Sequence, residues 1–212
     1  MGIAEGKISV VRRGVDASVF FPASRSEARS SLHLRKQVPI ALWVGRMVPV
    51  KGISVLLDAA AILVARKQSF ELYLIGSGEL LPSIQAWIVQ KNLAGHVHIV
   101  GAVNSSAALA SWYRSADCTV LTSVSEGIPN VLLESKACGT PFVASAVGGI
   151  PEIAEAGVDR LVRSGDAAAF ADALADAFTK SQSNATESVA VRSGRDAAAE
   201  LVEVIRASAS LG

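Results

Sequence analysis

Residues 40–57 read IALWVGRMVPVKGISVLL, and this stretch decides the fold class of the chain. The first five residues are apolar, as in a strand that helices cover on both faces of a sheet. Gly45 then marks a turn, and the apolar residues Ile53, Leu56 and Leu57 follow at helical spacing. A strand, a turn and a helix in this order form the first part of a βαβ unit, from which parallel sheets are built.

The same alternation recurs about six times along the chain. Further short apolar runs are typical of buried strands, namely Leu72–Ile75, Val97–Val100, Cys118–Leu121, Phe142–Ser145 and Leu161–Arg163. Amphipathic stretches between them predict helices around Leu80–Ile88, around Leu109–Ala116 and, after an N-cap at Asp166, around Phe170–Phe178. We therefore predict an α/β fold, a Rossmann-like three-layer domain with a mainly parallel sheet of about six strands.

The chain divides into three segments. Residues 1–38 are expected to be an interdomain segment and linker, with a short strand at Ile8–Val11 and a polar loop from Ser24 that runs into a short helix before Lys36. Residues 39–180 contain the βα alternation. Residues 181–212 are expected to be a polar linker and a C-terminal amphipathic helix, whose apolar positions are Ala197, Leu201, Val204 and Ile205.

Composition excludes several classes of protein. With 20 Lys and Arg against 19 Asp and Glu among 212 residues, the chain has no charge excess that would attract nucleic acid. A hydrophobic content of 50% and a charged content of 18% exclude a disordered chain. The most apolar stretch, Ser54–Ala65, is shorter than the roughly 20 residues that cross a bilayer.

The cysteines and histidines indicate no metal site and no disulfide framework. Cys118 and Cys138 lie in apolar surroundings without metal-ligand spacing, so we expect reduced thiols and a cytoplasmic location. His96 and His98 alternate along a predicted strand and are expected to be structural, and His33 has no neighbouring ligand.

The turn after the first strand carries two cations, Arg46 and Lys51, beside a helix N-terminus. In an open α/β sheet, ligands bind outside the carboxyl ends of the strands, so this turn faces the binding crevice. Cations and a helix N-terminus together favour an anion such as a diphosphate. Two solvated surface cations would give the same spacing, which alone does not decide between the two.

Two other enzyme classes are disfavoured by their motifs. Gly76-Ser77-Gly78 is similar to a dinucleotide fingerprint but lacks its third glycine, and about twenty residues later no acidic ribose ligand follows. These glycines are expected to form a tight turn that lines the crevice. Ser125-Glu126-Gly127 is not a nucleophile elbow, which leaves hydrolase chemistry without a nucleophile.

Two carboxylates flank the start of the helix that follows the fourth predicted strand. Glu126 precedes the helix, which is expected to begin near Pro129, and Glu134 lies on a helix that is otherwise apolar around it. The backbone amides between them that lack an intrahelical acceptor at the start of the expected helix are those of Asn130 and Val131. Carboxylates accept from hydroxyls and amides donate to phosphates, and a sugar nucleotide needs both. Glu126 could instead stabilise the helix dipole, whereas Glu134 needs a partner.

The run from Glu126 to Glu134 resembles the Glu-x7-Glu signature of retaining glycosyltransferases with the GT-B fold, and family 4 is the most similar group. Gly45-Arg46 with Lys51-Gly52 is similar to that family's first phosphate-binding turn. Gly14-Val15-Asp16 with Phe21-Pro22 is similar to its interdomain segment. The resemblance runs from about Ile8 to Phe178 and implies the C-terminal, donor-binding half of a GT-B fold, with 39–180 as the nucleotide-sugar-binding domain.

The resemblance implies a role for individual residues. Arg46, Lys51 and Glu126 would be catalytic, the two cations at the departing diphosphate and Glu126 at the transferred sugar. Glu134 would hold the ribose hydroxyls. Further donor-binding positions would be Gly45, Gly127, Ile128, Asn130 and Val131. The nucleotide base would rest near His98–Val103, where no side chain distinguishes uracil from guanine or adenine.

The implied activity is transfer of a hexosyl group from a nucleoside-diphosphate sugar to a glycan, lipid or small-molecule acceptor, without a cofactor or a metal. Family members place the acceptor site in an N-terminal domain that these residues do not contain, so a separate domain or subunit is the expected partner. This interpretation also admits peripheral membrane contact through that half, and self-association. The alternative is an isolated or truncated nucleotide-sugar-binding module that is inactive alone.

Overall fold

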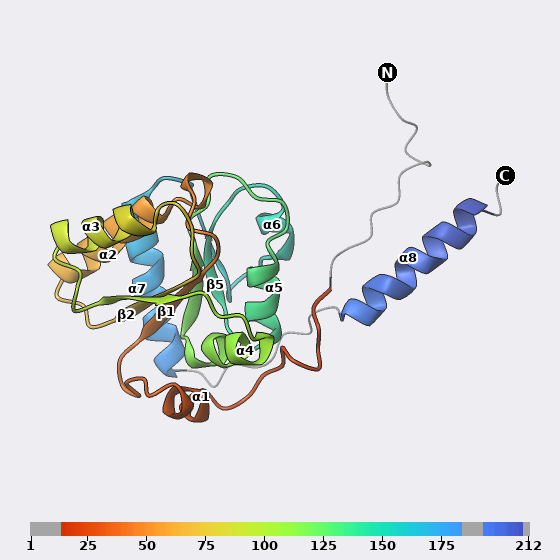
Figure 1. The fold of residues 1–212 in the computed structure, drawn as a ribbon, viewed down its shortest axis with the longest axis horizontal. Helices are drawn as coiled ribbons and strands as arrows, with labels where there is room; N and C mark the ends of the chain where they lie inside the picture. Colours follow the sequence, from red (N-terminus) through yellow and green to blue (C-terminus); the bar gives the residue numbers. More distant parts are fainter. Residues whose placement is uncertain (1–13, 184–192, 210–212) are drawn as a thin grey trace, which may run out of the picture.

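The computed structural model describes residues 14–183 and 193–209. Six strands form one parallel sheet in the order β3-β2-β1-β4-β5-β6 (Figure 1). The strands are β1 (Ile40–Val44), β2 (Glu71–Ile75), β3 (Val97–Gly101), β4 (Cys118–Leu121), β5 (Phe142–Ser145) and β6 (Arg160–Val162). The predicted Rossmann-like sheet is therefore confirmed. The order in which successive strands are added reverses between β1 and β4, and in open α/β sheets ligands bind outside the carboxyl ends of the strands at such a point.

Helices cover both faces of the sheet, which makes three layers. On one face lie α2 (Ile53–Ala65), α3 (Leu81–Gln90) and α7 (Ala167–Ser183). On the other lie α4 (Ser106–Ser115), α5 (Asn130–Ala137) and the short α6 (Ile150–Ile153). Successive β1 side chains alternate between the layers, so that Trp43 packs in the first core and Leu42 in the second, each fully buried.

The start of the described chain differs from the prediction. Helix α1 (Arg25–Ser31) begins directly after Ser24, whose hydroxyl accepts a hydrogen bond from the Glu27 amide at 3.3 Å. The polar loop thus follows the helix instead of preceding it, because Ser24 caps the helix N-terminus. The strand predicted at Ile8–Val11 lies outside the described residues.

Other boundaries shift by a few residues. Pro129 is the N-cap of α5, which begins at Asn130. Strand β6 begins at Arg160, one residue before the predicted position. Asp166 caps α7 as predicted, accepting from the Ala169 amide at 3.0 Å. Helix α7 continues to Ser183, so the first three residues of the predicted polar linker are helical.

The predicted terminal helix is present as α8 (Gly194–Ala209) and stands apart from the sheet in Figure 1. Its side chains Leu201, Val202 and Ile205 are exposed. The residue before α8 forms a parallel bridge with Val15, and the Gly194 amide donates to the Val15 carbonyl at 2.7 Å. Among the described helices, none is both long and apolar enough to cross a bilayer.

Cys118 and Cys138 are buried and free, in agreement with the predicted thiols. Burial raises the pKa of the Cys138 thiol to about 11 and raises the pKa of Cys118 as well. Both side chains therefore act as small apolar groups near neutral pH. The cytoplasmic location inferred from them remains a prediction.

Candidate functional site

The candidate site lies at the carboxyl ends of β1, β2, β4 and β5, where the loops touch backbone to backbone. A Cβ on Gly76, whose φ is +135°, would lie 1.8 Å from the Gly45 carbonyl oxygen. A Cβ on Gly148, whose φ is +55°, would lie 1.7 Å from the Glu126 carbonyl oxygen. Only glycine fits these two contacts. The Met47 amide also donates to the Ser77 carbonyl at 2.8 Å, so Gly76-Ser77-Gly78 runs alongside the loop after β1. The turn predicted at these glycines lies just after them, at Glu79–Leu80, where the Leu81 amide donates to the Gly78 carbonyl at 3.1 Å.

Lys51 and Glu126 are in contact at the carboxyl ends of these strands. Lys51 ends the 3-10 helix η2 (Pro49–Lys51), and its Nζ lies 2.6 Å from Oε1 of Glu126. The Ser123 hydroxyl donates to the same oxygen at 2.6 Å. The two charged side chains are 19% and 10% exposed, which shields their attraction from water more than at an open surface. Two predicted site residues, 75 positions apart in the sequence, are thus in direct contact.

Arg46 is the second cation of the site and is exposed in the turn after β1. Within residues 14–183 and 193–209, its guanidinium takes part in no hydrogen bond or ion pair. The alternative of two solvated cations therefore applies to Arg46 alone, since Lys51 is held by Glu126. An exposed guanidinium with five donors, five positions before an anchored ammonium in the segment that follows β1, suits a phosphate group.

Glu134 lies on the second turn of α5 and has the partner that its apolar helix demanded. The Tyr113 hydroxyl, from α4, donates to Oε2 of Glu134 at 2.8 Å. Burial raises the pKa of Tyr113 well above its usual 10.0, so the phenol stays a donor at neutral pH. Burial also raises the pKa of the Glu134 carboxyl above its usual 4.5, and the Tyr113 hydrogen bond partly opposes that rise.

The remaining predicted donor-binding residues lie around the N-terminus of α5. Gly127 and Asn130 are exposed, whereas Ile128 and Val131 are half-buried. The Gly149 amide donates to the Gly127 carbonyl at 3.1 Å, which ties this loop to the one after β5. The α5 N-terminus therefore belongs to the same edge of the sheet as Lys51 and Glu126. Donor contacts at these positions stay predictions.

Residues 38–180 match the family described as glycosyl transferases group 1. The chain belongs to this family. A D-inositol 3-phosphate glycosyltransferase from Thermobispora bispora is 36% identical over 184 residues, which cover 80% of this chain and 42% of that protein. One from Streptosporangium roseum is 37% identical over 173 residues, covering 77% and 40%. This group 1 glycosyltransferase chain thus spans less than half the length of these curated relatives.

Solved structures agree with that assignment. Sucrose-phosphate synthase from Thermosynechococcus elongatus superposes with a TM-score of 0.85 at 27% identity, covering 96% of this chain and 53% of the synthase. The C-terminal domain of LpcC, a group 1 family protein from Francisella tularensis, gives a TM-score of 0.70 at 25% identity, covering 80% and 90%. The glycosyltransferase chain has the fold of the C-terminal half of a GT-B enzyme.

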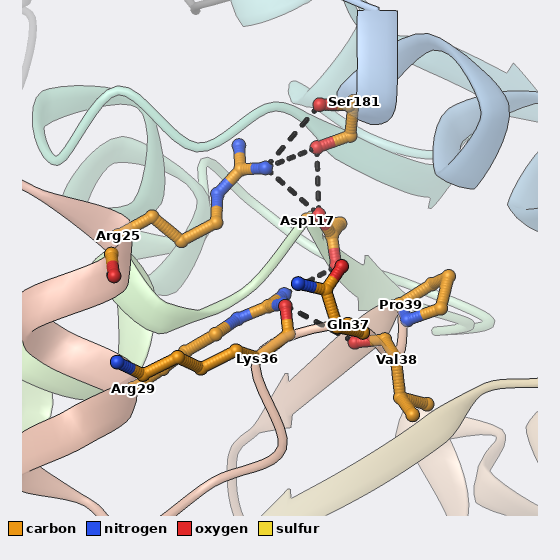
Figure 2. A pocket seen from close by; sticks show the side chains of 9 residues that line it. Arg25, Arg29, Lys36, Gln37, Val38, Pro39, Asp117 and Ser181 are labelled. Atoms are coloured by element: carbon orange, nitrogen blue, oxygen red, sulfur yellow. Dashed lines mark hydrogen bonds and ion pairs between the residues drawn. The ribbon is translucent and has the colours of Figure 1, made fainter.

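A cavity of about 510 Å³ lies on the other side of the sheet's strand ends, where β1 and β4 begin, and surrounds Asp117 (Figure 2). Asp117 directly precedes β4 and is buried. Its Oδ2 accepts from Arg29 at 2.6 Å and from the Ile40 amide at 2.6 Å, and its Oδ1 accepts from Arg25 at 2.9 Å and from the Ser181 hydroxyl at 2.7 Å. With both carboxylate oxygens fully engaged, Asp117 joins α1, β1, β4 and α7 and is a structural group.

Two residues that contact the candidate site residues are not singled out by the sequence. Tyr113 lies within the helix predicted around Leu109–Ala116, and no motif marks Ser123. The unmet need of Glu134 for a partner was a signal that a buried hydroxyl should lie nearby. Among the residues that the structure describes, no group of three His, Cys, Asp or Glu side chains could hold a metal ion.

Glu134→Gln is expected to raise the stability of the ligand-free glycosyltransferase chain at neutral pH. A carboxyl whose pKa is higher in the folded than in the unfolded state binds more protons when folded, so its contribution to stability falls as pH rises above about 4.5. The neutral amide lacks this loss, and its oxygen can still accept from Tyr113. The midpoint of thermal unfolding, measured across pH 4–8, should rise in the variant relative to the wild type as the pH increases. A difference between the two midpoints that stays constant over this pH range would contradict the burial of the Glu134 charge.

Proposed function

We propose that this chain is the donor-binding domain of a retaining glycosyltransferase that moves a hexosyl group from a nucleoside-diphosphate sugar to an acceptor. The observation that carries the proposal is the meeting of Lys51 and Glu126, beside the exposed Arg46, at the carboxyl edge of the sheet. A cation pair suits a diphosphate, and a carboxylate suits sugar hydroxyls. One compact site thus offers the two kinds of group that a sugar nucleotide requires.

The mechanism is electrostatic. Arg46 and Lys51 bind the diphosphate and neutralise the negative charge that grows as the bond to the sugar breaks. Glu126 accepts from a hydroxyl of the transferred sugar, and Glu134 accepts from the ribose hydroxyls. The acceptor attacks the same face from which the diphosphate departs, through an oxocarbenium-like state, and no protein nucleophile is needed. Two protein cations at the phosphates make a metal unnecessary in this scheme.

Lys51 can serve both partners at once. An ammonium has three donor hydrogens, and only one is used by Glu126. A phosphate oxygen can therefore share Lys51 without breaking its contact with Glu126. On this proposal the cation lies at the phosphates and the carboxylate at the sugar, which are adjoining parts of the donor.

The acceptor is assigned to a second domain or subunit. The chain spans 42% of the Thermobispora relative, and the remaining length of that protein is ample for another domain. On this proposal the chain alone binds the donor but transfers little sugar. The same observation favours the alternative function, a nucleotide-sugar-binding module without activity of its own. Robust transfer by the purified chain would exclude the module.

Donor binding is tested by thermal unfolding with UDP-, GDP- and ADP-sugars. A ligand at 100 times its dissociation constant stabilises the folded state by about 2.7 kcal/mol. For a chain of this size, each kcal/mol raises the midpoint by roughly 2–4 °C. We expect one base to give a rise of about 5–10 °C and the free sugar to give none. The absence of a rise with every nucleotide sugar would contradict the proposal.

A further inference from the structure

The end of β4 continues into two consecutive hydroxyl residues, Thr122 and Ser123, both fully buried. The Thr122 hydroxyl lies 3.1 Å from the Lys51 carbonyl oxygen and 2.9 Å from that of Gly52. The Ser123 hydroxyl donates to Oε1 of Glu126 at 2.6 Å. One hydroxyl therefore fixes the backbone that carries Lys51, and the next contacts the side chain of Glu126.

The backbone of Ser123 is itself fixed from two sides. The hydroxyl of Ser164, from the loop after β6, donates to the Ser123 carbonyl at 3.1 Å. The amide of the following residue, Val124, donates to the Val50 carbonyl at 2.8 Å. Since Ser123 is also fully buried, the backbone from which its hydroxyl extends is held in place. A donor held this firmly can determine the orientation of the carboxylate that it contacts.

The two donors to Glu126 converge on one oxygen. Both Lys51 and Ser123 contact Oε1, and within the described chain Oε2 has no hydrogen-bond partner. An ionised carboxylate has about four acceptor positions, so Oε2 keeps its capacity for a ligand hydroxyl. Lys51 alone would give Oε1 a single contact from a long, flexible side chain. The Ser123 bond adds a second contact from a short, buried side chain and so narrows the positions that the carboxylate can take.

We propose that Ser123 is a positioning residue of the donor site, which holds Glu126 so that its second oxygen receives a hydroxyl of the transferred sugar. This inference rests on the proposed function. The inference predicts different effects on the two parts of the donor, because Ser123 acts through Glu126, which contacts the sugar. The nucleoside diphosphate binds through Arg46 and Lys51. Thr122 fixes the backbone of Lys51 independently of Ser123, so the diphosphate depends far less on Ser123 than the sugar does.

The test compares Ser123→Ala with the wild type in the full chain. Calorimetric titrations use the nucleotide sugar among UDP-glucose, GDP-mannose and ADP-glucose that binds the wild type most tightly, and then its sugar-free nucleoside diphosphate. We expect the dissociation constant for the nucleotide sugar to rise about tenfold, as for the loss of one hydrogen bond to a charged group. The constant for the diphosphate should stay within twofold. Ser125→Ala, an exposed serine two residues away, should change neither constant.

Each other result contradicts the inference. An equal loss for both ligands, or a loss for neither, means that Ser123 has only a structural role. Ser123→Cys, which keeps a weaker donor of similar size, should give an intermediate loss specific to the sugar, and this variant decides the matter if the alanine variant unfolds at a lower temperature. Failure of the wild type to bind any of the three nucleotide sugars would instead contradict the proposed function itself.

Discussion

Arg46→Ala is expected to lower the rate of sugar transfer by about 10²- to 10³-fold in an enzyme that contains this domain and its acceptor half. The guanidinium is exposed at the crevice and serves no structural contact within the described chain, so its loss removes charge from the departing diphosphate and nothing from the core. Initial rates at saturating donor measure the effect, and the midpoint of thermal unfolding should stay unchanged.

Arg66→Ala is the matched control for Arg46. Arg66 is also a surface arginine, but it lies at the far end of α2 and pairs with Asp172. Its removal should leave the transfer rate within about twofold, because it is remote from the carboxyl edge of the sheet. Normal turnover by Arg46→Ala, or an equal loss in both variants, would contradict the assignment of Arg46 to the diphosphate.

Asp117→Ala should lower the free energy of unfolding by about 3–5 kcal/mol, the usual cost of breaking a buried ion pair from one side. The side chain of Asp117 is only 5% exposed, and that of Arg29, its closer cation, is 6% exposed. Without the carboxylate, Arg29 remains buried without its counter-charge and the Ile40 amide loses its acceptor. Urea unfolding followed by circular dichroism measures the change.

The control for Asp117 is Asp172→Ala. Asp172 also forms an aspartate–arginine pair at 2.6 Å, but its side chain is 66% exposed. Exposed pairs contribute about 0–1 kcal/mol, so this variant should remain close to the wild type. If Asp117→Ala cost no more than Asp172→Ala, the network in Figure 2 would not be what joins α1 and α7 to the sheet.

The sheet was predictable because strands buried on both faces need uninterrupted apolar sequence. The runs at Ile40–Val44, Cys118–Leu121 and Phe142–Ser145 are strands with the predicted boundaries. The predicted order of loop and helix after Ser24 was wrong, although the sequence carries the signal for a helix start there: Ser24 and Glu27 have the spacing of a capping box. Local signals of this kind need only a few neighbouring residues.

The candidate site was predictable in part. Arg46, Lys51, Glu126 and Glu134 were found through their place after strands and through a family resemblance. The residues that contact them were not predictable from local sequence; Tyr113, for example, reaches Glu134 from 21 positions away. Asp117 shows the same limit, since its four partners come from three different elements, α1, β1 and α7, and no periodicity in the sequence marks it.

The central claim, that a nucleotide sugar binds between Arg46 and Glu134 at the carboxyl edge of the sheet, is tested most directly by mapping amide chemical shifts. The chain, labelled with ¹⁵N, would be titrated with the nucleotide sugar that stabilises it most. We predict the largest shifts in residues 45–52 and 126–134, with none around Asp117. Shifts confined to the Asp117 edge, or no shift at saturating concentration, would contradict the account.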